Sequence, residues 1–159
     1  MGCIVALALV VSCSTDGATD APGACSAAEG EPFISRSGQS SPPEDLLWWA
    51  GFNDVGDLEI VGADEACGID AAARIALRGS PAEIDAALAA AGFEGDPSPG
   101  VSVFQPPLGG IELDELTDVV TSDPQVWENE AGETITRVYV RGRTGQGEQE
   151  LLHLWAFTT

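Results

Sequence analysis

The chain has 159 residues, with 26 Asp and Glu against six Arg, no Lys and one His, and its formal net charge is -20. This length fits one compact domain plus a tail and excludes repeat arrays. The negative charge argues against binding to nucleic acid and against electrostatic docking on anionic lipid, because both attract Lys and Arg. A hydrophobic fraction of 44% indicates a chain that folds.

The N-terminal segment carries a targeting pattern. Residues 3–13 read CIVALALVVSC, an uncharged run that is shorter than the roughly 20 apolar residues of a membrane span and matches the apolar core of a signal peptide. Its last four residues, VVSC, resemble the lipobox of bacterial lipoproteins. The resemblance covers this segment alone. It implies a signal peptide over residues 1–12, acylation of Cys13 and a lipid anchor in the bilayer at the extracytoplasmic face of the membrane.

Other interpretations of this segment stay open. Signal peptides begin with a positively charged stretch, whereas Met1 and Gly2 carry no charged side chain, which leaves an upstream start codon open. The Met-Gly start also suits N-myristoylation, although that motif favours Ser or Thr where this chain has Ala6. In a third interpretation the run is a buried strand or helix of a cytosolic protein. The lipoprotein interpretation is favoured over these.

Residues 13–40 are predicted to be a flexible acidic tether. They are rich in Ser, Gly, Ala, Pro and acid, and such a composition buries too little apolar surface to offset the entropy of ordering the chain. In an exported protein Cys25 and Cys67 are the two cysteines that remain, so we predict a disulfide between them. Two unpaired thiols are the alternative. No cysteine spacing indicates zinc, and neither a metal nor another cofactor is expected.

Residues 41–159 are predicted to form a single α+β domain, and two helix starts are well signalled in it. Ser41-Pro42-Pro43-Glu44 and Ser80-Pro81-Ala82-Glu83 each combine an N-cap Ser, a Pro and a Glu at the third helical position, the pattern of a capping box. The two helices then end at Gly51 and Gly92. A third, weaker helix is predicted to begin at Asp114.

Strand signals fill the rest of the domain. In chain order they are residues 57–62, 72–79, 101–104, 125–129, 134–143 and 149–158, the last three as a meander. The mixed order of elements predicts a mainly antiparallel sheet of about 5–6 strands with two or three helices packed on it. Residues 149–158 are apolar on both sides, which places this strand inside the sheet. We expect one helix on each face.

The few positive charges form the most informative cluster. Alternation puts Arg74 and Arg78 on one side of a strand. It also puts Arg137, Tyr139 and Arg141 on one side of another strand, which Arg143 follows. If the two strands are neighbours, these side chains crowd one sheet face and bind a small anion or an acidic protein partner, because guanidinium groups suit carboxylates and phosphates. The favoured alternative is cross-strand pairing with acids such as Glu59 and Glu150.

No catalytic constellation stands out. His153 lies between Leu151 and Trp155 on one side of its strand, which indicates a packed side chain with one hydrogen-bond partner more than a general base. The chain has no G-x-S-x-G and no H-E-x-x-H motif. The clusters of acidic residues indicate weak and unselective binding of screening cations, and not a specific metal site. Of Trp48 and Trp49, the favoured interpretation packs both over the sheet, and the alternative leaves one as an exposed recognition residue.

Three functions remain, and catalysis is the less favoured. The first is a membrane-tethered lipoprotein with a non-catalytic binding domain for an unknown protein or small anionic ligand. The second is a tethered hydrolase that uses carboxylates or His153. The third is a surface inhibitor or immunity-type lipoprotein.

Overall fold

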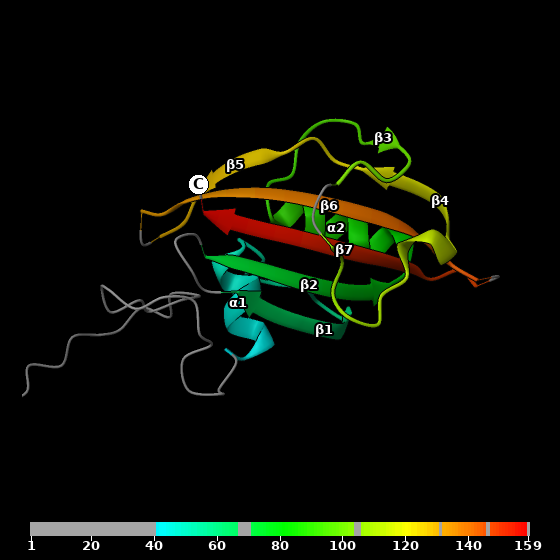
Figure 1. Cartoon of the computed structure of the whole chain (residues 1–159), viewed down its shortest axis with the longest axis horizontal. Coiled ribbons are helices and arrows are strands. Elements are labelled where there is room, and N and C mark those ends of the chain that lie inside the picture. The colour runs from blue at the N-terminus through cyan, green and yellow to red at the C-terminus, as the bar shows by residue number, and fades with distance from the viewer. Residues whose placement is uncertain (1–40, 67–70, 104–105, 131, 146, 159) are drawn as a thin grey trace, which may run out of the picture.

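A computed structural model of the chain describes residues 41–66, 71–103, 106–130, 132–145 and 147–158 (Figure 1). Cys13, Cys25 and Cys67 lie outside the described residues. The predicted lipidation, tether and disulfide therefore stay predictions.

Two α-helices, one 3-10 helix and seven strands make up the described part of the chain. The helical elements are α1 (Pro43–Trp49), α2 (Pro81–Ala90) and η1 (Leu113–Glu115). The strands are β1 (Glu59–Ala66), β2 (Ala72–Gly79), β3 (Ser98–Pro99), β4 (Leu116–Thr121), β5 (Gln125–Glu128), β6 (Thr134–Thr144) and β7 (Glu150–Thr158). All strand pairs are antiparallel, so the predicted α+β class is confirmed, with a sheet slightly larger than expected. Among the helices of the described residues, none has the length and apolarity to cross a membrane.

Strand β7 lies inside the sheet, as its two apolar sides predict. The strand order is β1-β2-β7-β6-β4-β3, and β5 pairs with the other end of β6. Residues 151–156 of β7 are all buried. The sheet therefore has a buried core on each face, and alternate residues of one strand belong to different cores.

Both helices pack on the same face of the sheet, which corrects the expected arrangement of one helix on each face (Figure 1). Leu46 and Trp49 of α1 and Ile84 and Leu88 of α2 join Ile75 of β2 in one core cluster. The opposite face is covered by the chain between β3 and β4, which crosses in front of β7 and β2 in Figure 1. Apolar side chains of this segment and of β4 take the place of the expected helix. They are Leu108, Ile111 and Leu116 over Ala76 and Leu151, and Val103, Leu113 and Val119 over Val138, Val140 and Trp155.

One of the two predicted capping boxes forms. The Oγ of Ser80 accepts a hydrogen bond from the Glu83 N–H at 3.3 Å, and Glu83 Oε2 accepts one from the Ser80 N–H at 2.7 Å. The capping box predicted at Ser41 does not form, because the Ser41 N–H and hydroxyl both donate to the Glu65 carboxylate, at 3.0 and 2.8 Å. Helix α1 then begins after Pro42 with no side-chain cap. Ser41 instead fastens the start of the domain to β1.

Two further elements differ from prediction. The third helix is a single 3-10 turn, and the apolar residues after it form β4, because pairing with β6 satisfies their backbone groups. The strand predicted at residues 101–104 does not form over residues 101–103. The short strand β3 precedes it and pairs with the end of β4.

Candidate functional site

The predicted arginine patch does not form, because its two strands are not neighbours. Strand β7 separates β2 from β6. Arg74 lies opposite Trp155 of β7, which lies opposite Val138 of β6, whereas Arg137 lies opposite Ala156. Arg74 and Arg78 are therefore on one face of the sheet, and Arg137, Tyr139 and Arg141 are on the other. Accordingly, Ile75 and Leu77 of β2 belong to the helix-side core, whereas Val138 and Val140 of β6 belong to the core on the opposite face.

Four of the five described arginines pair with acids, as the alternative interpretation predicted. Arg74 pairs with Asp64, Arg78 with Glu59, Arg141 with Asp85 and Glu150, and Arg143 with Asp118. Arg74–Asp64 and Arg78–Glu59 are directly opposite residues of β2 and β1. Partly exposed pairs of this kind contribute at most about 1 kcal/mol each. They stabilise the sheet and leave these guanidinium groups occupied.

Arg137 has a different environment at the junction of both helices with the sheet. Its side chain is only 2% exposed. Its Nη1 donates to the carbonyl oxygens of Ala50 and Ala91, each at 3.0 Å, and these residues are the C-caps of α1 and α2. The C-terminal end of a helix carries a partial negative charge. One guanidinium group thus neutralises two helix ends and ties them to β6.

Aromatic rings and a glycine complete this junction. The guanidinium carbon of Arg137 lies 4.6 Å from the Phe93 ring centroid and 5.0 Å from that of Trp127, within the range of cation–π attraction. Gly51 has a φ of +87°, and a Cβ there would lie 2.5 Å from Nη1. Burial lowers the pKa of Arg137 to about 10, so the group stays charged at neutral pH. Its Nε is buried and has no hydrogen-bond partner among the residues that the structure describes.

A shallow depression opens to solvent beside this junction. It measures about 460 Å³, and its lining residues are Gly92, Glu94, Gln125, Val126, Trp127 and Arg137. The side-chain amide of Gln125 donates to the Glu94 carbonyl and accepts from the Glu94 N–H at 3.3 Å, which fastens the turn after α2 to β5. We refer to this feature as the Trp127 depression.

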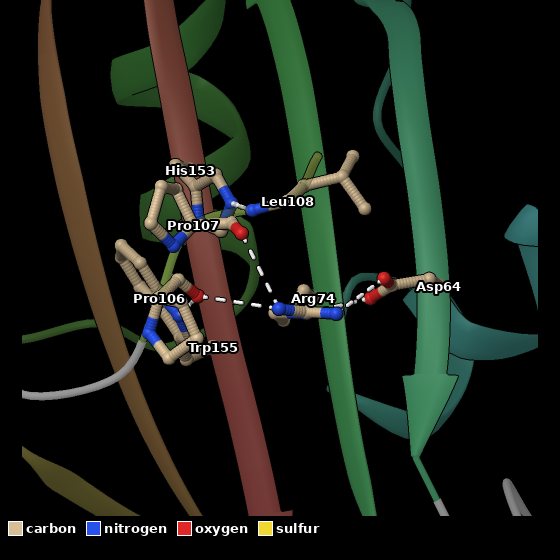
Figure 2. Close-up of polar contacts among 7 residues, drawn as sticks. All are labelled: Asp64, Arg74, Pro106, Pro107, Leu108, His153 and Trp155. Carbon is tan, nitrogen blue, oxygen red and sulfur yellow. Dashed lines mark hydrogen bonds and ion pairs between the residues drawn. The ribbon is translucent and has the colours of Figure 1, made fainter. Parts of the chain in front are cut away.

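On the opposite face, three side chains hold residues 106–108, which we call the strap (Figure 2). Arg74 grips both oxygens of Asp64, with Nε–Oδ1 2.8 Å and Nη2–Oδ2 2.5 Å. Its Nη1 donates to the Pro106 and Pro107 carbonyls at 3.4 and 3.3 Å. The indole N–H of Trp155 donates to the Pro106 carbonyl at 3.1 Å. The strap is thereby fixed to β7 and β2.

His153 supplies the third contact and is held neutral. Its Nε2 accepts the Leu108 N–H at 2.8 Å (Figure 2), and its side chain is fully buried. The pKa of His153 is lowered to about 4, mainly by burial and also by the charge of Arg74, while Asp64 acts in the opposite direction. The prediction of a packed histidine with one hydrogen-bond partner is confirmed. The nitrogen that a general base would use is occupied by the Leu108 amide.

The two tryptophans that were candidates for recognition pack against the protein. Trp49 is fully buried and donates to Glu133 Oε2 at 3.0 Å, and Trp48 is half-buried against the helix-side core. Within the residues that the structure describes, no group of three or more His, Cys, Asp or Glu side chains is placed to hold a metal ion.

The comparisons with known proteins give no relative: no family model, no curated protein and no solved structure matches the chain. Sequence reasoning placed Arg137 in a surface patch and missed its role at the helix ends. One sequence signal could have indicated that Arg137 is buried. Ile135 and Tyr139 lie two residues before and after it, on the same side of β6, and both are buried.

Proposed function

We propose that this chain is a lipid-anchored extracytoplasmic protein whose α+β domain binds a ligand or partner without catalysis. The observation that carries the anchoring is the VVSC sequence at the end of an uncharged run of eleven residues. The following 27 residues are rich in Ser, Gly, Ala, Pro and acid, and the described domain begins after them at Ser41. This order of an apolar run, a Cys, a polar segment and a folded domain is expected of a tethered protein.

The chemistry of the described domain supports binding over catalysis. His153, the single imidazole, is enclosed and committed to the strap. Four described arginines are occupied by carboxylates. The Trp127 depression is open to solvent next to a charged group, and it combines an aromatic side chain with a polar one, as ligand sites do.

Metabolic labelling with a radioactive fatty acid in a bacterial host tests the anchoring. We expect label on the wild-type chain and on Cys25→Ala, which is the matched control, and none on Cys13→Ala. A Gly2→Ala variant separates this chemistry from N-myristoylation, because it keeps the label only if Cys13 is the acceptor. An unlabelled wild type, or equal label on Cys13→Ala, would refute the anchor.

A further inference from the structure

The least exposed arginine side chain of the described domain has no carboxylate partner. Arg74, Arg78, Arg141 and Arg143 all have one, although each is more exposed than Arg137. Helix-end carbonyls offset part of the charge on Arg137, but they engage Nη1 alone. The other edge of this guanidinium group is unused.

Arg74 shows how the Nε and Nη2 edge of an arginine binds a carboxylate in this domain. Its Nε and Nη2 donate to the two oxygens of Asp64, at 2.8 and 2.5 Å, which is the bidentate geometry that suits a carboxylate. In Arg137 the same two nitrogens have no acceptor among the described residues. A buried donor left without an acceptor is costly, and more so when it is charged. An incoming carboxylate would satisfy both nitrogens at once.

Arg137 lines the Trp127 depression, so a group bound there lies beside this side chain. Trp127, which packs against the helix-side core, provides an apolar wall of the depression. We infer that the Trp127 depression is a subsite for the carboxylate of a ligand, with Nε and Nη2 of Arg137 as donors and an apolar body against Trp127. This inference rests on the proposed binding role of the domain and names its ligand class.

The surrounding charges select a single carboxylate over a phosphate or a polyanion. Glu94 is exposed at the rim of the depression, and the Ala50 and Ala91 carbonyls already direct negative ends toward Arg137. A second negative charge on the ligand would be repelled by all three, whereas one planar carboxylate matches the free edge of the guanidinium group.

Tryptophan fluorescence of the full-length chain, titrated with N-acetyl-leucine and with the neutral N-acetyl-leucinamide, tests the inference. We expect the acid to bind at least about tenfold more tightly than the amide, because the bidentate charged hydrogen bonds are lost with the amide. N-acetyl-leucine mimics the carboxyl end of a peptide, and isocaproate mimics a free acid with the same side chain. The tighter of the two identifies the source of the carboxylate, and equal affinity supports a site that reads the carboxylate and side chain alone.

Three variants locate the site. Arg137→Lys keeps the charge but not the bidentate edge, so binding should weaken at least about tenfold. Arg78→Lys, the same change at a paired arginine on the other face, should leave binding unchanged. Glu94→Gln removes a rim charge from an exposed residue and should tighten binding of the acid, which keeps the inference testable if Arg137→Lys fails to fold.

The inference is overturned if acid and amide bind equally or neither binds. It is also overturned if folded Arg137→Lys binds as the wild type, if Arg78→Lys loses as much binding, or if Glu94→Gln leaves affinity unchanged. Acylation of Cys13 is measured separately, so failure of this subsite and failure of the anchor are distinguishable.

Discussion

Replacing His153 with Gln should remove a specific part of the acid sensitivity of this domain. In the folded chain the pKa of His153 is lowered to about 4 by burial, against an ordinary value of 6.5. As the pH falls through 6.5 the unfolded chain takes up this proton and the folded chain does not, so the free energy of unfolding falls. The stabilising effect of the neutral imidazole is complete above pH 6.5 and is lost as the pH approaches 4. At about 1.36 kcal/mol per pKa unit, the largest loss is about 3 kcal/mol.

Urea unfolding of the wild type and of His153→Gln between pH 8 and pH 4 measures this loss. The acidic residues are common to both proteins, so their titration cancels in the difference of unfolding free energies. We expect that difference to shift against the wild type by up to about 3 kcal/mol between about pH 7 and pH 4. The protection factor of the Leu108 amide, whose N–H donates to His153, should fall over the same range more in the wild type than in His153→Gln. A difference that stays constant with pH would refute a neutral, buried His153.

Three smaller predictions test other contacts of the fold by thermal or urea unfolding. Gly51→Ala should destabilise by about 2 kcal/mol or more, because the residue has a φ of +87° and a Cβ would meet Nη1 of Arg137 at 2.5 Å; unchanged stability would contradict that close contact. Ser80→Ala should lower the free energy of unfolding by about 1 kcal/mol, because the capping box of α2 is lost. Ser41→Ala should remove no helix cap, because α1 has no side-chain cap. A loss of helix α1 capping in Ser41→Ala equal to that of α2 in Ser80→Ala would contradict this difference. Arg78→Gln should cost less than about 1 kcal/mol, because its pair with Glu59 is partly exposed at 3.3 Å; a loss of several kcal/mol would show that the pair does more.

The elements that sequence predicts well are those determined by local signals. Strand β2 has the predicted bounds, and α2 begins after Ser80 with the predicted capping box. The inside position of β7 also follows from a local pattern, since apolar residues on both sides of a strand require two covered faces. Each of these inferences needs only residues that are close in the chain.

The environment of Arg137 could not be predicted, because its partners are distant in the chain. The carbonyls that Arg137 binds are 87 and 46 residues away, and every residue has a carbonyl, so no side-chain pattern marks these two. The assignment of arginines to one face failed for a related reason. An apolar residue beside an arginine shows that the opposite side of the strand is buried, but it does not say in which of two cores, and that depends on strand order. The interpretation that most arginines pair with nearby acids needed only an abundance of acids. It holds for Arg74, Arg78, Arg141 and Arg143 and fails for Arg137.

Because the domain is strongly negative, the affinity of the proposed subsite should depend on salt in the opposite direction to that of an ordinary anion-binding patch. Residues 41–159 have a net charge of -17, and the Trp127 depression has Glu94 at its rim, so a carboxylate approaching through solvent is repelled over a long range and attracted only at contact. Raising the ionic strength from about 0.01 M to 0.15 M shortens the screening length from about 30 Å to about 8 Å. This weakens the long-range repulsion more than the short hydrogen bonds to Arg137. We therefore expect the affinity for isocaproate to rise with salt over this range, measured by the same tryptophan fluorescence. A steady fall in affinity with salt would show that exposed arginines, and not the buried edge of Arg137, attract the ligand.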